Sequence, residues 1–137
     1  MKNVVIDTSV AMKWFFPENG FEKALDLKAQ HMKGELTLYT RDLFLYEFVS
    51  AFKNYSMNTI EEKDISLAVA ALMSLNIELV PLQSQEAEML YALSRRLHIS
   101  VYDGSFILLA SHMKAPLVTA DKKLYLKGKK EIKMVWV

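Results

Sequence analysis

The stretch VVIDTSVAMKW, residues 4–14, contains a strand, an acid and the beginning of a helix in immediate succession. Val4, Val5 and Ile6 are β-branched residues, which favour a strand. Asp7 ends that strand, and a stretch of helical spacing follows it. Four other short runs have the same strand character, and longer stretches of helical period separate them. These runs are residues 36–39, 77–80, 117–119 and 134–137.

Alternation of this kind predicts an α/β fold, in which the strands form a parallel sheet and helices cover both of its faces. Two of the helical stretches carry clear apolar stripes, at residues 65–75 and 86–97. Thr59 and Glu62 predict a capping box at the start of the first of these helices. Because ligands of such sheets bind beyond the carboxyl ends of the strands, functional residues are expected at that edge.

The composition indicates a single globular domain over residues 1–137, a length that can bury a sizeable core. No apolar run is long enough to span a membrane, and the N-terminus lacks the apolar stretch of a signal peptide. The chain has no cysteine, which excludes disulfides, thiolate nucleophiles and zinc–thiolate sites. A cytoplasmic location is expected. The net charge of +1 indicates neither the presence nor the absence of a nucleic-acid partner.

Four acidic residues stand in apolar sequence contexts. Asp7 and Asp121 end the strands VVID and LVTAD, Asp103 opens an almost wholly apolar helix, and Glu47 lies about mid-helix within LFLYEFVSAF. Carboxylates buried together drive one another to protonate, and a divalent cation removes that conflict. Because Mg²⁺ and Mn²⁺ prefer hard oxygen ligands and keep bound waters, the four acids predict a metal site.

Structural roles are the alternative interpretation of the same residues. Each of the three aspartates could simply cap a following helix, since aspartate is a favoured N-cap residue. Capping does not explain Glu47, which is interior to its predicted helix. Glu47 could instead pair with Arg41 or Lys53, although a separation of six residues is unfavourable for contact along one helix.

The segments VVIDTSVAMKW, LYEFVSAF, VYDGSFILLA and LVTADKKL resemble, in order and spacing, the four acidic motifs of PIN-domain nucleases. The resemblance covers essentially the whole chain and is strongest to the VapC-like toxins of toxin–antitoxin pairs. It implies a three-layer α/β/α fold with a five-stranded parallel sheet. It also implies a metal-dependent endoribonuclease that uses Mg²⁺ or Mn²⁺, acts on RNA, binds a VapB-like antitoxin and forms a homodimer, with no membrane partner.

The resemblance carries residue roles over by position. The catalytic and metal-binding acids would be Asp7, Glu47, Asp103 and Asp121, and Ser9 and Thr119 match hydroxyl positions that support those carboxylates. Three positions depart from the family pattern: Ser50 stands where asparagine is frequent, Gly104 where alanine is common, and Arg41 with Asp42 where a proline often precedes the glutamate helix. None of these departures removes a predicted metal ligand.

Two other functions compete with this prediction. One is a catalytically silent PIN-like module that only binds a partner, against which the presence of all four acids argues. The other is an acid-pocket phosphoryl-transfer or receiver-type domain. A receiver usually has adjacent acids at the end of its first strand and a phosphorylated aspartate after its middle strand. Here Asp7 stands alone, and the segment IELVPL carries no aspartate.

Other candidate functional residues carry weaker signals. His31, His98 and His112 are scattered without a paired metal-ligand spacing, and surface or helix-packing roles are expected for them. Six lysines lie between Lys122 and Lys133. They are expected to form a solvated face, with contact to a phosphate backbone as the alternative.

Overall fold

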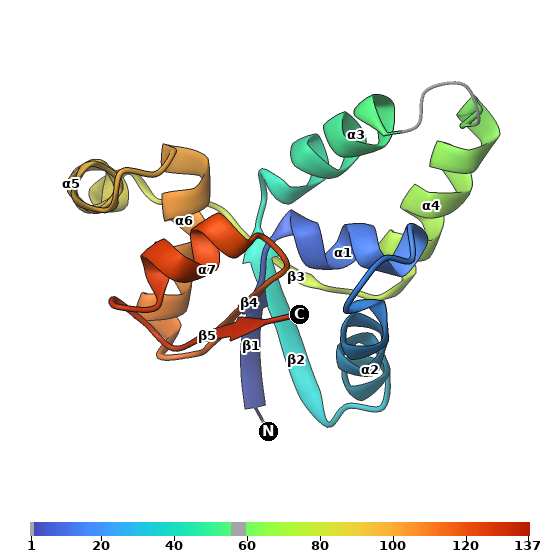
Figure 1. Ribbon diagram of the computed structural model, residues 1–137, viewed down its shortest axis with the longest axis horizontal. Coiled ribbons are helices and arrows are strands. Elements are labelled where there is room, and N and C mark those ends of the chain that lie inside the picture. The colour runs from blue at the N-terminus through green and yellow to red at the C-terminus, as the bar shows by residue number, and fades with distance from the viewer. Residues whose placement is uncertain (1, 56–59) are drawn as a thin grey trace.

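Five parallel strands form the centre of the molecule, and helices lie on both sides of them (Figure 1). The structure is a computed structural model and describes residues 2–55 and 60–137. The strands are β1 (Lys2–Ile6), β2 (Leu36–Arg41), β3 (Glu78–Val80), β4 (Leu117–Thr119) and β5 (Met134–Trp136). Each predicted strand is confirmed, and all neighbouring strands pair in parallel.

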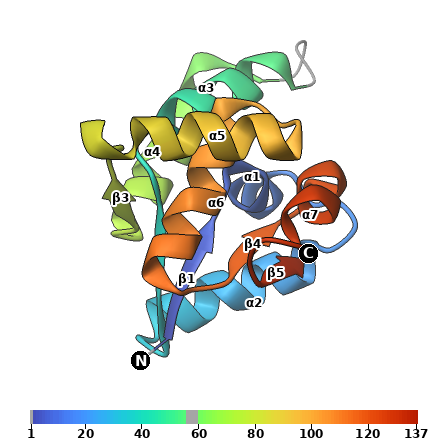
Figure 2. The same cartoon turned by 90° about the vertical axis from the view of Figure 1, so that its left-hand side faces the viewer.

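The helices form two layers. One face of the sheet is covered by α1 (Thr8–Phe15), α2 (Phe21–Met32), α3 (Phe44–Asn54) and α4 (Glu62–Ser74). The other face is covered by α5 (Ala87–Leu97), α6 (Val101–Met113) and α7 (Lys122–Gly128), and the short 3₁₀ helix η1 (Ser84–Glu86) leads into α5. Helices α5, α6 and α7 face the viewer in Figure 2. The predicted three-layer α/β/α arrangement is therefore confirmed.

Each face of the sheet has its own hydrophobic core. Val4 and Ile6 of β1 pack into the core under α1 to α4, whereas Val5 packs into the core under α5 to α7. Adjacent residues of one strand thus serve opposite faces, as expected for a sheet covered on both sides. On α3, the buried stripe of the helix includes Phe44 and Phe48, which are 1% and 0% exposed.

The strand order β3-β2-β1-β4-β5 places a topological switch point between β1 and β4. From β1 the chain builds outward through β2 and β3, then returns to add β4 on the other side of β1. Val5 and Ile6 pair with Leu117 and Val118, so the two strands end side by side. Ligands of open α/β sheets bind at such a point. Receiver domains have the order 2-1-3-4-5, so the receiver interpretation is wrong.

Two details of the helices bear on the sequence predictions. Thr59, the predicted start of the capping box, lies outside the described residues. The described helix α4 begins at Glu62, and the backbone N–H of Glu61 donates a 2.9 Å hydrogen bond to Asp64 Oδ2. None of the helices in residues 2–55 and 60–137 is long and apolar enough to cross a membrane.

Candidate active site

Five acidic side chains line one pocket of about 880 Å³ at the carboxyl edge of the sheet. Four of them are the acids singled out in the sequence, Asp7, Glu47, Asp103 and Asp121, and the fifth is Glu18. Asp7 directly follows β1, and Asp121 follows β4 by two residues. Glu47 and Asp103 lie in the first turns of α3 and α6. The pocket therefore collects one carboxylate from each of four separate segments of the chain.

Asp7 is the most deeply held of the four, with only 5% of its surface exposed. Its Oδ1 accepts hydrogen bonds from the backbone N–H and the hydroxyl of Ser9, at 3.1 and 2.5 Å. Its Oδ2 accepts a 2.6 Å bond from the hydroxyl of Thr119. Burial raises the pKa of Asp7 to about 6, the two hydroxyl bonds oppose this increase, and the charges of Asp103 and Asp121 add to it.

The same two hydroxyls tie the β1 end to the β4–α7 loop. Ser9 Oγ accepts a 2.9 Å bond from the N–H of Ala120, and Thr119 Oγ1 accepts a 3.0 Å bond from the N–H of Asp121. Ser9 and Thr119 therefore bond to the Asp7 carboxylate and to the backbone beside Asp121 at once. This arrangement fixes the relative position of two acids that lie more than one hundred residues apart in the sequence.

The capping interpretation holds for two of the three aspartates. Asp7 is the N-cap of α1, and Asp121 caps α7 through a 3.2 Å bond from the N–H of Leu124. For Asp103 it is wrong, because the N-cap of α6 is Ser100, whose hydroxyl accepts a 3.0 Å bond from the Asp103 N–H. The carboxylate of Asp103 is thus left without a capping role.

The surroundings of the acids differ in polarity. The expectation that all four lie in apolar surroundings is wrong for Asp121, which is exposed. Asp103 is half-buried, and burial raises the pKa of its carboxyl. The charge of Asp121 raises this pKa further, whereas the Ser100 bond and the nearby charge of Lys123 lower it. Partial burial and like charge together oppose the ionisation of Asp103.

Glu47 is held by Thr8, which adjoins Asp7 in the sequence. The hydroxyl of Thr8 donates a 2.8 Å hydrogen bond to Glu47 Oε1, across 39 positions of the chain. Burial raises the pKa of Glu47, the Thr8 bond lowers it, and the charge of Asp103 raises it. The expected mid-helix position is wrong, because Glu47 lies in the first turn of α3. The alternative pairing with Arg41 is wrong as well, since that arginine pairs with Glu86.

The pocket residues fit a hard divalent cation that keeps water ligands. Their four carboxylates are hard oxygen donors, and repulsion among them is relieved by a bound cation. In residues 2–55 and 60–137, no group of three or more acidic or histidine side chains lies close enough to form a complete ligand set. Mg²⁺ is usually held by one or two carboxylates together with several waters.

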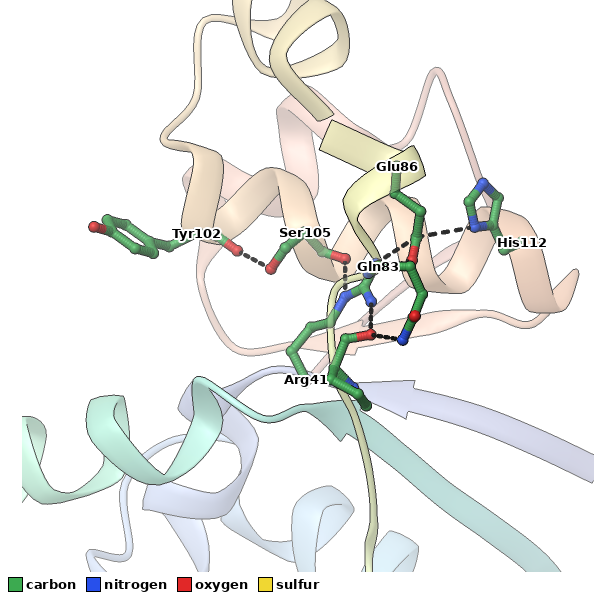
Figure 3. Close-up of polar contacts among 7 residues, drawn as sticks. Arg41, Gln83, Glu86, Tyr102, Ser105 and His112 are labelled. Carbon is green, nitrogen blue, oxygen red and sulfur yellow. Dashed lines mark hydrogen bonds and ion pairs between the residues drawn. The ribbon is translucent and has the colours of Figure 1, made fainter. Parts of the chain in front are cut away.

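A buried arginine connects the sheet to the helix that carries Asp103 (Figure 3). Arg41, at the end of β2, is 1% exposed, and its Nε donates a 2.8 Å bond to the carbonyl of Ser105. Its Nη1 donates to the carbonyl of Pro81, and its Nη2 lies 3.3 Å from Glu86 Oε2. His112 Nδ1 approaches the same carboxylate oxygen at 3.2 Å. The first turns of α6 are thereby fastened to β2.

The ionic state of Glu86 follows from this arrangement. Burial alone would raise the pKa of Glu86, but the N–H of Gln83 and the guanidinium of Arg41 outweigh it, so the pKa is lowered. Glu86 therefore stays ionised opposite the buried arginine. Ser105, whose carbonyl accepts from Arg41, lies only two residues after Asp103. The ion pair accordingly supports the backbone that presents one of the four acids.

Several residues of the site were missed from the sequence. Thr8 gave no signal, because it acts through a partner that is distant in the chain. Arg41 was considered only as a partner of Glu47 and as a departure from the family pattern, because its contact with Ser105 is equally distant. Two exposed tyrosines, Tyr46 and Tyr102, line the pocket. A signal for them did exist, since each directly precedes one of the acids in the segments LYEF and VYDG.

The histidines lie outside the pocket. His31 accepts a 3.1 Å bond from the N–H of Leu38 at Nδ1, so its Nε2 carries the proton that faces the Leu75 carbonyl at 2.6 Å. His31 thus joins α2, β2 and the end of α4. His98 ends α5 in the left-handed conformation, and its carbonyl accepts a bond from Lys127.

Comparison with known proteins agrees with the observed architecture. No curated protein sequence matches the chain. Among solved structures, PAE2754 from Pyrobaculum aerophilum superposes with a TM-score of 0.69 at 19% identity, covering 96% of this chain and 83% of that one. VapBC2 from Rickettsia felis, bound to a DNA fragment from its promoter, gives 0.66 at 16% identity and covers 96% of both chains. VapBC-5 from Mycobacterium tuberculosis gives 0.64 at 19% identity over the full length of both.

At these identities the structural matches establish the fold. Family membership comes from the sequence profile of the PIN domain, which matches residues 4–130. The matched range begins within β1 and contains β2 to β4, all seven α-helices of the described residues and the acids Asp7, Glu47, Asp103 and Asp121. The chain therefore belongs to the PIN domain family.

Proposed function

We propose that residues 1–137 form one nuclease domain, a divalent-metal-dependent endoribonuclease that uses Mg²⁺ or Mn²⁺ and acts as the toxin of a toxin–antitoxin pair. The observation that carries the proposal is the gathering of four carboxylates from four segments on a single pocket at the switch point of the sheet. Helix capping alone does not require Glu47 and Asp103 to face the same pocket as Asp7 and Asp121.

Each acid has a role in the proposal. Asp7 and Asp103 are the direct metal ligands, and Glu47 and Asp121 complete the site directly or through water. A carboxylate offers about four lone-pair positions, so Asp7 keeps acceptor capacity beyond its bonds from Ser9 and Thr119. When bound, the metal lowers the pKa of a water and neutralises charge on a phosphodiester oxygen. The reaction is hydrolysis without a covalent enzyme intermediate.

The Thr8 hydroxyl has a positioning role in this chemistry. Its 2.8 Å bond to Oε1 restrains the rotation of the Glu47 carboxylate and would leave Oε2 to hold a water at the site. RNA as the substrate is supported by the resemblance of the four acidic motifs to those of VapC-like toxins. Structural similarity to the VapBC proteins supports the assignment to a toxin–antitoxin system.

The direct test is divalent-dependent cleavage of RNA by the purified protein. Wild type is expected to cleave in Mg²⁺ or Mn²⁺ and to be silent in EDTA, and Asp103→Asn and Asp7→Asn are expected to abolish cleavage with an unchanged circular dichroism spectrum. The matched control is Asp26→Asn, an exposed aspartate on α2, which should cleave as wild type does. Full cleavage by both site variants would overturn the assignment of the acids. Absence of cleavage by wild type in either metal would favour the catalytically silent binding module.

A protein partner is the second part of the proposal. A pocket with four acids would attract a basic side chain strongly wherever water is excluded. The partner would be a small VapB-like antitoxin encoded beside this chain, and the toxin itself would form a homodimer. Co-expression with the adjacent gene product, followed by size-exclusion chromatography with light scattering, measures both. Separate elution of the two proteins with undiminished cleavage would contradict the antitoxin assignment.

A further inference from the structure

Two tyrosine rings stand exposed beside the acids. Tyr46 is 84% exposed and Tyr102 is 61% exposed, and both line the pocket. They come from opposite layers of the fold, Tyr46 from α3 and Tyr102 from α6 (Figure 1). In Figure 3 the Tyr102 ring points away from the Arg41 network. The two rings therefore reach the same pocket from opposite sides of the sheet.

Neither ring is used by the fold. Within residues 2–55 and 60–137, the ring and hydroxyl of Tyr46 and Tyr102 have no hydrogen bond, ion pair or ring contact. Other tyrosines are engaged: Tyr55 stacks on Phe16 with ring centroids 3.8 Å apart, and Tyr91 accepts a hydrogen bond from Arg95. Both rings are therefore free to contact a ligand that enters the pocket beside the acids.

The charge of the pocket restricts how a nucleic acid binds there. The lining contains five acids, the four discussed above together with Glu18, against one lysine, Lys13. Lys13 is already engaged, since its Nζ donates to the carbonyl of Asn19. The excess of acids in the lining therefore opposes electrostatic attraction to phosphates, the usual source of nucleic-acid affinity. Stacking of bases on aromatic rings is a second source, and it requires no positive charge.

We propose that Tyr46 and Tyr102 form a base-stacking subsite that holds the unpaired nucleotides on either side of the phosphodiester presented to the acids. This inference rests on the proposed function and extends it to substrate selection. Bases within a duplex are already stacked on each other and have no free face for a protein ring. The subsite consequently selects single-stranded RNA and tolerates different base sequences, because every base has a face that can stack.

The test is a binding measurement that does not depend on cleavage. A short single-stranded oligoribonucleotide that carries 2-aminopurine is titrated with the protein in EDTA, because 2-aminopurine fluorescence is quenched when the base stacks. Wild type should quench it, and a double-stranded form of the same oligonucleotide should not be quenched. Tyr46→Leu and Tyr102→Leu should each weaken binding about five- to 150-fold and remove part of the quenching. Tyr46→Phe and Tyr102→Phe keep the ring and should behave as wild type.

The matched control is Tyr91→Leu, a tyrosine of α5 that is 60% exposed and lies outside the pocket. Its binding and quenching should equal those of wild type. Leucine variants of Tyr46 and Tyr102 that bind and quench like wild type would overturn the subsite, even if the protein cleaves RNA in Mn²⁺. If these variants bind RNA like wild type but no longer form the complex with the antitoxin, the subsite would also be overturned, and the two tyrosines would be assigned to the antitoxin contact. Tyrosine-dependent quenching without cleavage in any metal would support the subsite and count against the nuclease.

Discussion

Replacement of Asp7 by asparagine is expected to stabilise the metal-free protein at alkaline pH and to weaken its response to metal. The folded protein raises the pKa of Asp7 from 3.8 to about 6. A carboxyl whose pKa is raised by folding contributes its full stability at pH values below its pKa in the unfolded chain. That contribution is lost as the pH rises through its pKa in the folded protein. Ionisation of Asp7 therefore makes the folded protein less stable above about pH 6.

The pKa difference sets the size of the effect. At about 1.36 kcal/mol per pH unit, it corresponds to about 3 kcal/mol of unfolding free energy lost between about pH 4 and pH 7. Asparagine removes this loss. The amide oxygen of asparagine can still accept from Ser9, but its NH₂ group would face the Thr119 hydroxyl. In the wild-type protein that hydroxyl donates to Asp7, and the amide nitrogen cannot accept this bond. The lost bond costs about 1 kcal/mol, which leaves a net gain of about 2 kcal/mol at alkaline pH.

Denaturant unfolding followed by tryptophan fluorescence measures this quantity. In EDTA at about pH 8, the free energy of unfolding of Asp7→Asn should exceed that of wild type by about 2 kcal/mol. In a thermal melt of a chain of this length, this difference corresponds to a midpoint about 8 °C higher. At about pH 4 the order should reverse, because both side chains are then neutral and only the lost bond remains. Added Mn²⁺ should stabilise wild type, by about 2.7 kcal/mol at one hundred times Kd, and stabilise the variant less.

Asp26→Asn is the control for the general removal of a negative charge, because Asp26 is exposed on α2 and accepts a hydrogen bond from the neighbouring Gln30 side chain. Its stability should stay within about 0.5 kcal/mol of wild type at both pH values. An Asp7→Asn variant that is less stable than wild type by the same amount at both pH values would refute the reasoning. So would a variant that gains as much from Mn²⁺ as wild type.

Three further predictions concern the surroundings of the site. Glu47→Gln should melt higher than wild type in EDTA, gain less from Mn²⁺ and cleave poorly; equal metal stabilisation would make Glu47 structural. Glu86→Gln should cost about 3 kcal/mol or more in denaturant melts near neutral pH, because Arg41 is left as a buried charge without its anion. This cost should shrink as the pH falls through the lowered Glu86 pKa. Gly104→Ala should cost about 1–3 kcal/mol, because its Cβ would lie 2.3 Å from Ser94 Oγ, and Ser94→Ala should recover much of that loss. Equal costs with and without Ser94 would contradict this explanation.

Local pattern was sufficient to predict the elements of the fold. The five strands appear where short β-branched runs stand, because such side chains fit a buried, pleated surface whichever neighbours they meet. Asp7 and Asp121 could be placed at the sheet edge for the same reason, since each follows a strand directly or by two residues. The candidate acids of the pocket were therefore accessible from the sequence.

Only the tertiary structure decided how these acids are held. Asp7 meets Thr119 across 112 positions because β4 returns to lie beside β1, and no local pattern encodes that return. Glu47 lies in the first turn of α3 and bonds to Thr8 because the phenylalanine stripe of the helix occupies the core. Local spacing cannot report such contacts, because strand order and the burial of competing apolar residues set them. The same long-range packing leaves Tyr46 exposed beside the acids rather than buried with the phenylalanines.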